Sequence, residues 1–340
     1  MSSEATPIRE NPTAGIAAKQ SESSRTRTLR NYLAAYGFLA PAAIIVITFF
    51  FIPMLLVLYL SVTNLSTVNF TTDIGKMLNP ENDYYVGLNN FKVITRDEFT
   101  PKILFNTVFY VLTTLAIFNV GMALLIALLT AHIPRRAGFF FRALWILPRI
   151  TPSVIYILMW KRMMADPPFG ILNQFNEVTG GTPKNYYQEY PWVFVVLSNG
   201  FIGVSFGMVI FTSAIESIPK DLMNASLVDG STLLQRIRYI ILPLLRWPLL
   251  FVVTYQTLSL LNSFEYILLL TRGGPGLYQT EVWSQTAYTR SLSTYFANSQ
   301  WGMGAAFAVI LMIIGVIMAT IYMRVFNFQE LVAEPKVEIL

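Results

Sequence analysis

The chain has no cysteine and a single histidine, His132. Without cysteine, disulfide frameworks, thiolate catalysis and cysteine metal sites are excluded, and one histidine excludes a multi-histidine metal site. Charged residues are scarce, at 13% of the chain, against about 25% in soluble domains. No Gly-Lys-Ser/Thr sequence follows the glycine-rich run at 273–276, so this run is not a phosphate-binding loop. We therefore expect no catalytic residues, no resident cofactor or metal, and no ATP hydrolysis by this chain alone.

Apolar residues make up 54% of the 340 residues, so lipid is the expected solvent for most of the chain. The net charge is +5, and the basic residues are scattered along loops rather than gathered on one face. This distribution favours cytoplasmic anchors of a multi-pass membrane protein over a nucleic-acid interface. No nucleic-acid partner is expected.

Six segments have the roughly 20 mostly apolar residues that a membrane-spanning helix requires. They are 36–62, 103–131, 139–164, 192–215, 244–271 and 301–324. The third is the weakest, because Arg142, Pro148, Arg149 and Pro152 interrupt it. The pattern predicts an all-α membrane protein with six transmembrane helices and no separate outer domain.

Lysine and arginine in short loops predict the orientation. Basic residues precede the first span, fill the connection after the second and lie in the loop after the fourth. The N-terminal segment and both of these loops are cytoplasmic if both termini of the chain are inside the cell. We expect a disordered cytoplasmic tail at 1–31, a transmembrane domain at 32–326 with a cytoplasmic loop at 216–243, and a cytoplasmic tail at 327–340.

The loop at 216–243 is polar yet helical in pattern. Pro219 suits the first turn of a helix, and Asp221 complements the positive end of its dipole. Gly230 offers the left-handed conformation that closes a helix, and Ser231 can cap a second helix. We expect a helix, a glycine corner and a second helix that leads into the membrane.

The sequence of this loop reads Asn224-Ala225-Ser226, then Gly230, then Ile240-Ile241-Leu242-Pro243. It resembles the coupling loop of binding-protein-dependent ABC importer permeases: Glu-Ala-Ala, three residues, Gly, nine residues, Ile-x-Leu-Pro. Asn224 stands where that pattern has glutamate, and it offers only neutral hydrogen bonds to an ATPase subunit. The family's contacts imply ATPase coupling through Asn224, Ala225, Ser226, Asp229, Gly230 and Arg236.

Further motifs resemble the larger permease subunit of carbohydrate importers of the maltose type. They are 86–91, the run from Phe139 to Pro152, and 270–276 with Thr280. The resemblance implies a type I ABC importer permease fold in a bacterial inner membrane. It also implies a heterodimer with a second permease, two ATPase subunits that carry ATP and magnesium, an extracytoplasmic solute-binding protein, and a saccharide as the substrate.

The substrate path should be lined by polar groups that lipid would not tolerate. In the fourth span Asn199, Gly203 and Phe206 share one helix face, as Gln256, Ser259 and Ser263 do in the fifth, with Leu260 between them. Amides, hydroxyls and an aromatic ring suit a sugar. The alternative is that glycine and serine here only allow close helix packing.

Arg149 has two interpretations. It could bond to carbonyls freed by Pro148 and Pro152, or it could face the cavity and favour an anionic or strongly polar saccharide. Other function classes stay open. They are an ABC permease for a polyol or glycerol phosphate, a secondary transporter, which would need an ion site, and an intramembrane enzyme, which would need a catalytic set.

Overall fold

A computed structural model describes residue 32 and residues 36–70, 84–292 and 298–326 of the chain. Within them the protein is built of helices joined by loops, and β-pairing is limited to one bridge between Thr63 and Tyr85. The predicted tails at 1–31 and 327–340 lie outside the described residues. The chain divides into two units, Met1–Val57 and Leu58–Leu340.

Four uninterrupted helices are long and apolar enough to cross a membrane. They are Tyr36–Ser61, Thr100–Ala131, Pro191–Glu216 and Trp301–Val325. Their bounds agree with four of the predicted segments to within three residues. Two further pairs of helices pass the same test only as bent pairs, so the described residues hold four spans, or up to six if each pair is one span.

The first of these helices includes a π-helical turn, η1 (Ile47–Phe51), followed by α2 (Ile52–Ser61). In the most apolar 18-residue stretch of this helix, no residue is buried within the protein. Exposed phenylalanine and isoleucine side chains therefore require lipid or another subunit as their surroundings.

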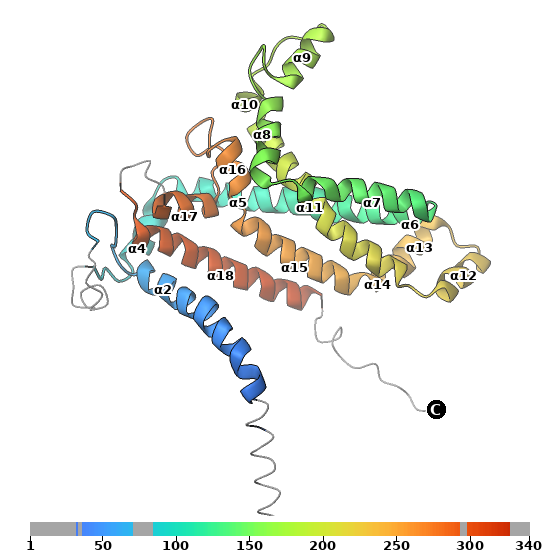
Figure 1. Cartoon of the computed structure of the whole chain (residues 1–340), viewed down its shortest axis with the longest axis horizontal. Helices are drawn as coiled ribbons and strands as arrows, with labels where there is room; N and C mark the ends of the chain where they lie inside the picture. Colours follow the sequence, from blue (N-terminus) through green and yellow to red (C-terminus); the bar gives the residue numbers. More distant parts are fainter. Residues whose placement is uncertain (1–31, 33–35, 71–83, 293–297, 327–340) are drawn as a thin grey trace, which may run out of the picture. The chain divides into compact units, whose positions relative to one another are not determined.

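The second span contains α5 (Thr100–Thr113), the π-helical stretch η2 (Thr114–Met122) and α6 (Ala123–Ala131). It packs against α11 (Pro191–Glu216), the most buried of the four candidate spans. α18 (Trp301–Val325) packs against α15 (Arg246–Asn262) and against α17 (Trp283–Leu292). Figure 1 shows α6, α7, α11, α15 and α18 side by side in the second unit.

The predicted third span at 139–164 is two helices rather than one. α7 (Arg135–Ile150) and α8 (Ser153–Met163) meet at an angle of 96°. Proline disfavours the helical conformation of the residue before it, and Thr151 accordingly has an extended ψ of 133° ahead of Pro152. Hydropathy located the apolar stretch but not this bend.

The predicted fifth span at 244–271 is also broken. α13 (Leu233–Arg236), η3 (Ile237–Ile241) and α14 (Leu242–Leu244) lead into α15 through a bend of 68°. α15 ends at Asn262, and α16 (Glu265–Leu270) follows after Ser263, whose ψ is 91°. A continuous helix from 244 to 271 was therefore wrong, because the chain leaves helical geometry at Ser263.

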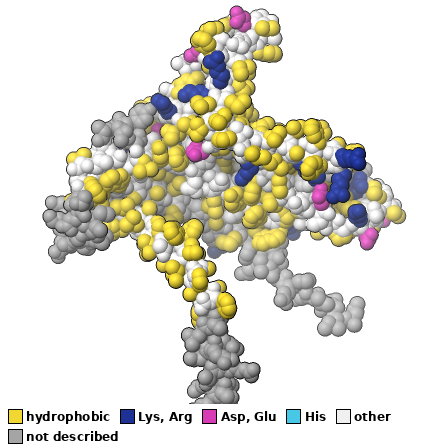
Figure 2. Space-filling model, viewed as in Figure 1, with side chains coloured by type: hydrophobic (Ala, Val, Ile, Leu, Met, Phe, Trp, Pro, Cys, Tyr) yellow, Lys and Arg dark blue, Asp and Glu magenta, His cyan; other side chains and the backbone are white. Residues whose placement is uncertain are grey.

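Short helices fill the remaining loops of the second unit. α4 (Asn89–Arg96) precedes the second span, and α9 (Ile171–Val178) and α10 (Tyr186–Glu189) lie between α8 and α11. α12 (Lys220–Val228) follows α11 at the end where α7 begins. Figure 2 shows lysine and arginine side chains gathered at this end and hydrophobic side chains along the helices between the ends.

Candidate cargo pocket and coupling element

A pocket of about 490 Å³ lies where α7 breaks into α8, facing α11, α15 and α16. Six of the eight residues expected along the substrate path line it. They are Arg149, Asn199, Gly203, Gln256, Ser259 and Ser263. Ile150, Thr151, Pro152, Ser153, Ile202, Tyr255 and Tyr266 complete the lining. The two helix breaks thus expose polar side chains and backbone inside segments that are otherwise apolar.

Asn199 on α11 connects the pocket to the second span. Its amide nitrogen donates to the Tyr110 hydroxyl and to Ser263 Oγ, the latter at 2.7 Å. Tyr110 is fully buried and in turn donates to Ser263 Oγ at 3.4 Å. Three helical regions are therefore held together at the pocket by one hydrogen-bonded group, which fixes the orientation of Asn199.

Gln256 and Ser259 present polar groups from α15. The Gln256 amide nitrogen donates to the Gly203 carbonyl at 2.9 Å, which ties α15 to α11. Ser259 is exposed, and its hydroxyl has no hydrogen-bond partner among the described residues. A free hydroxyl in a polar pocket is available to a cargo that carries hydroxyl groups of its own.

Gly203 has a packing role beside its place in the lining. A Cβ atom there would lie 2.0 Å from Asn119 Oδ1, and one at Gly207 would lie 2.4 Å from the Asn119 carbonyl oxygen. A Cβ at Gly200 would lie 2.4 Å from the Phe118 ring. These glycines allow α11 to approach the second span closely, which is the alternative that the sequence left open.

Leu260 does not line the pocket. Its side chain is 3% exposed and belongs to the hydrophobic core of the second unit. It follows Ser259 on α15 and points about 100° away from it, because successive residues of an α-helix are rotated by that angle. The sequence places Leu260 along the substrate path, whereas in the structure its side chain packs in the core.

Phe206 does not line the pocket itself, but its ring contacts two residues that do, Tyr255 and Arg149. Its ring stacks on the Tyr255 ring at a centroid distance of 4.6 Å, and the Arg149 guanidinium lies 5.7 Å from the Phe206 centroid. Tyr255 also stacks on Phe251 at 6.3 Å. Arg149 makes no described hydrogen bond to the carbonyls near Pro148 and Pro152, so the geometry favours the cavity-facing interpretation.

Sequence reasoning missed Tyr110, Thr151, Tyr255 and Tyr266. The sequence could have identified Tyr255, because Tyr255 and Ser259 are four residues apart and share a helix face. Thr151 and Tyr266 enter the pocket only because the chain breaks beside them. Tyr110 comes from another span, and nothing in local spacing predicts which helices are neighbours.

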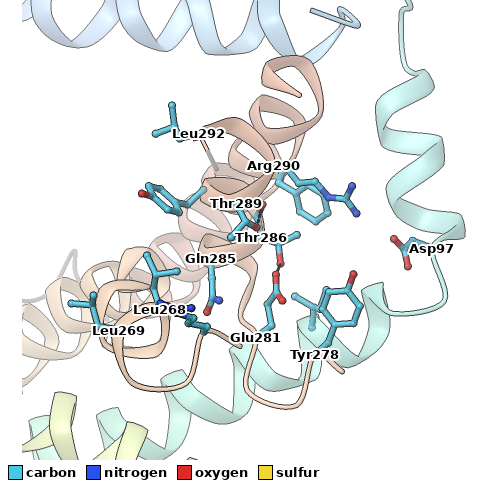
Figure 3. Close-up of a pocket in the computed structure, with 14 residues that line it drawn as sticks. Asp97, Leu268, Leu269, Tyr278, Glu281, Gln285, Thr286, Thr289, Arg290 and Leu292 are labelled. Atoms are coloured by element: carbon cyan, nitrogen blue, oxygen red, sulfur yellow. Dashed lines mark hydrogen bonds between the residues drawn. The ribbon is translucent and has the colours of Figure 1, made fainter. Parts of the chain in front are cut away.

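A second pocket, of about 680 Å³, lies among α16, α17 and the loop between them (Figure 3). Glu281 points into it and accepts a hydrogen bond of 2.8 Å from Thr286 Oγ1. Burial raises the pKa of the Glu281 carboxyl, while the Thr286 hydrogen bond and the positive charge of Arg290 lower it. Gln285 lies beside it and is 1% exposed.

The glycine-rich run at 273–276 lies between two lining residues, Arg272 and Tyr278, and the loop that contains it is held by the second span. Asn106 Nδ2 donates to the carbonyls of Tyr278 and Glu281 at 2.9 and 3.0 Å. The hydroxyls of Thr271 and Thr280 lie 2.7 Å apart, and Thr280 Oγ1 donates to the Gly274 carbonyl. The loop is thus a fixed turn, a conformation that its glycines and proline favour.

The coupling element consists of α12 and α13. Gly230 has a φ of 72°, which confirms the predicted left-handed corner. Ser231 N and Oγ both donate to the Ser226 carbonyl, at 3.0 and 2.6 Å. This pattern closes α12 in the manner of a Schellman motif.

The cap of the second helix is one residue later than predicted. Thr232, not Ser231, is the N-cap of α13, and it forms a capping box with Gln235. Thr232 N donates to Gln235 Oε1 at 2.8 Å, and Gln235 N donates to Thr232 Oγ1 at 3.4 Å. Ser231 is not free to cap, because its hydroxyl already satisfies the end of α12.

The surface of this element is largely uncovered. Asn224, Ala225, Asp229 and Gly230 are exposed, whereas Ser226 is buried and Arg236 is half-buried. Apolar side chains are exposed as well, with Val228 at 88% and Leu234 at 74%. An exposed apolar surface on a polar loop is typical of an interaction site.

An ion pair links α7 to the end of α11 just ahead of this element. Arg142 Nη1 donates to Glu216 Oε1 at 2.6 Å. The pair thus connects α7, which ends at the pocket, to the end of α11 that precedes α12.

These features define a helical membrane permease subunit that has a polar pocket at broken spans and an uncovered, rigid element on a loop. Residues 119–328 match the family of binding-protein-dependent transport system inner membrane components. The chain belongs to that family.

Two relatives and one solved structure illustrate the likeness. The chain is 32% identical over 303 residues to the probable ABC transporter permease protein YesP of Bacillus subtilis, covering 86% of this chain and 91% of that protein. It is 26% identical over 249 residues to the trehalose/maltose transport system permease protein MalF of Thermococcus litoralis, covering 72% and 81%.

A similar fold occurs in the crystal structure of a bacterial ABC transporter involved in the import of the acidic polysaccharide alginate. The match has a TM-score of 0.73 at 19% identity and covers 89% of this chain and 98% of that one. The expected ABC importer permease fold is thereby confirmed. At this level of identity the likeness concerns the fold alone.

Proposed function

We propose that this chain is one of two permease subunits of an ATP-driven importer and that its cargo is a saccharide. The polar pocket at the broken spans carries the proposal, because amide and hydroxyl groups at membrane depth need a polar occupant. Permeases named for trehalose and maltose are among the similar proteins, which supports a sugar as cargo.

In this proposal the protein crosses a bacterial inner membrane six times, with each bent pair as one span and both termini in the cytoplasm. The basic residues at the start of α7 and on α12 support this orientation. Residues 1–31 and 327–340 are cytoplasmic tails, and residues 32–326 are the transmembrane domain.

The remaining parts of the importer are separate polypeptides. A second permease forms a heterodimer with this chain, two ATPase subunits bind ATP and magnesium, and an extracytoplasmic binding protein delivers the cargo. The ATPase contact is made by Asn224, Ala225, Ser226, Asp229, Gly230 and Arg236. The exposed apolar side chains of α12 and α13 support a docked partner.

The pocket receives the cargo when the complex is open to the outside. Asn199, Gln256, Ser259 and Ser263 supply hydrogen-bonding groups. Arg149 and Tyr255 also line the pocket, and the Phe206 ring contacts both of them. Closure of the ATPase dimer moves α12, and the motion passes to α11 and, through the Arg142–Glu216 pair, to α7. Such coupling requires contacts that differ between the two states.

ATP-driven uptake in proteoliposomes tests this function. The complete complex, with its binding protein, should take up a saccharide only when ATP is supplied. Ser259→Phe should reduce uptake roughly tenfold or more, since the ring fills a pocket without removing any described hydrogen bond of the fold.

Thr320→Phe is the matched control for that variant. Thr320 is an exposed hydroxyl residue on α18 and lies outside the pocket lining. It should leave uptake near the wild-type rate. Uptake on an ion gradient without ATP, or a Ser259→Phe complex that transports normally, would contradict the proposal.

A further inference from the structure

We infer that the cargo carries an anionic group, a carboxylate or a phosphate on a polyhydroxylated body, and that Arg149 recognises it. This inference rests on the proposed function, because it concerns the cargo of the same pocket. It adds a charge requirement that a neutral sugar would not meet.

Arg149 lies in the last turn of α7, immediately before the break at Thr151. Its side chain is exposed in the isolated chain and lines the pocket. None of the lining residues is acidic. The nearest acidic residue along the facing helix is Glu265, beside Tyr266, and it is exposed and forms no ion pair with Arg149 among the described residues.

A guanidinium stays charged at any physiological pH, so its charge cannot be relieved by losing a proton. A charge at membrane depth is costly unless an opposite charge, water or a cavity accompanies it. The neighbouring arginine of α7, Arg142, has such a partner in Glu216 at 2.6 Å. Arg149 lies over the ring of Phe206, 5.7 Å from the centroid, and near Tyr266 in the same lining, and it forms no ion pair with any described residue.

Contact with a ring leaves the donors of the guanidinium available. The Phe206 ring can support the flat face of Arg149, while the N–H groups lie along the edge of the plane and suit a two-point contact with a carboxylate or phosphate. The Phe206 ring also stacks on the Tyr255 ring, at a centroid distance of 4.6 Å, which helps to hold it in place. The arrangement is that of a positioned anion receptor.

The other pocket groups suit the neutral part of such a cargo. The described hydrogen bonds of Asn199 and Gln256 are donated by their amide nitrogens, which leaves the amide oxygens as acceptors for hydroxyl groups. The Ser259 hydroxyl is also without a partner in the described part of the chain. One positive charge beside several neutral hydrogen-bonding groups matches an acidic sugar better than a neutral one.

The test compares matched probes with the complete complex in proteoliposomes. The probes are trigalacturonate, its neutral methyl ester, glycerol 3-phosphate and maltotriose. We expect ATP-driven uptake of trigalacturonate or glycerol 3-phosphate, and which of the two is taken up identifies the anionic group. Arg149→Gln should reduce that uptake roughly tenfold or more, and Arg149→Lys should retain a larger part of it because the charge remains.

Arg162→Gln is the matched control, because Arg162 on α8 also lies over a ring, that of Phe169 at 5.5 Å, but outside the pocket lining. It should leave uptake unchanged. If wild type and Arg149→Gln take up maltotriose or the methyl ester equally well, the cargo needs no charge and this inference is wrong. Saccharide import, the proposed function, would still be supported. Uptake of an anionic probe that Arg149→Gln does not alter would overturn the role of Arg149. Failure of all four probes in a complex that hydrolyses ATP would contradict both this inference and the proposed function.

Discussion

Replacing Gly230 by glutamate should reduce ATP-driven uptake roughly tenfold or more, because the ATPase subunit would bind α12 more weakly. Gly230 has a φ of 72°, and a Cβ there would meet no atom of this chain within 4 Å. The side chain would therefore extend from the exposed corner into the docking surface of a partner. The measurement is uptake together with co-purification of the ATPase subunits.

Gly180→Glu separates this effect from backbone strain. Gly180 has a φ of 78° and also no atom within 4 Å of a Cβ, but it follows α9, on the opposite side of the membrane in the proposed topology. Both variants should cost the same roughly 1–2 kcal/mol of left-handed strain. Equal loss of uptake in both would show that strain, not docking, explains the Gly230 result.

Replacing Gly207 by leucine should prevent stable packing of α11 on the second span. A Cβ at Gly207 would lie 2.4 Å from the Asn119 carbonyl oxygen and 2.9 Å from the Ala123 Cβ. The first of these is backbone and cannot rotate away, so the helices must separate. We expect loss of the assembled complex in size-exclusion chromatography, and for Gly207→Ala a destabilisation of about 1–3 kcal/mol.

Gly315→Ala on α18 provides the control for Gly207→Ala. A Cβ at Gly315 would lie 3.2 Å from Leu258 Cδ2, the end of a flexible side chain that can move. It should lower the thermal unfolding temperature much less than Gly207→Ala. Normal assembly of Gly207→Leu would contradict the close approach of α11 to η2.

The apolar spans could be predicted closely because the bilayer sets their length. The segment predicted at 192–215 is the helix Pro191–Glu216, and the segment predicted at 301–324 is Trp301–Val325. Hydropathy does not register where a helix bends, so the breaks at Thr151 and Ser263 were not predicted. Pro152 offered a local signal for the first, whereas nothing in the residues around Ser263 marks the second.

The pocket was predictable in part for a related reason. Residues on one helix face follow from spacing alone, which brought together Asn199 with Gly203, and Gln256 with Ser259. Spacing does not distinguish a lining residue from a packing residue. Gly203 therefore serves both roles, and Leu260 belongs to the core.

The coupling element was predicted more fully because its conformation is local. A left-handed glycine and the caps beside it depend on a few consecutive residues, and Gly230 behaves as expected. The cap moved from Ser231 to Thr232, since the Ser231 hydroxyl bonds to the Ser226 carbonyl. Two adjacent hydroxyl residues compete for one role, and only the three-dimensional path of the chain decides between them.

Cross-linking of α12 to an ATPase subunit tests the central claim most directly. The chain has no cysteine, so Asn224→Cys introduces a unique thiol on the exposed face of α12. A short bifunctional maleimide should join it to a single-cysteine ATPase variant, with a yield that changes when ATP binds. Thr182→Cys, on the loop after α9 that is outside the cell in the proposed topology, should give no such product. An intact, transporting complex in which Asn224→Cys never cross-links to the ATPase in any nucleotide state would contradict the account.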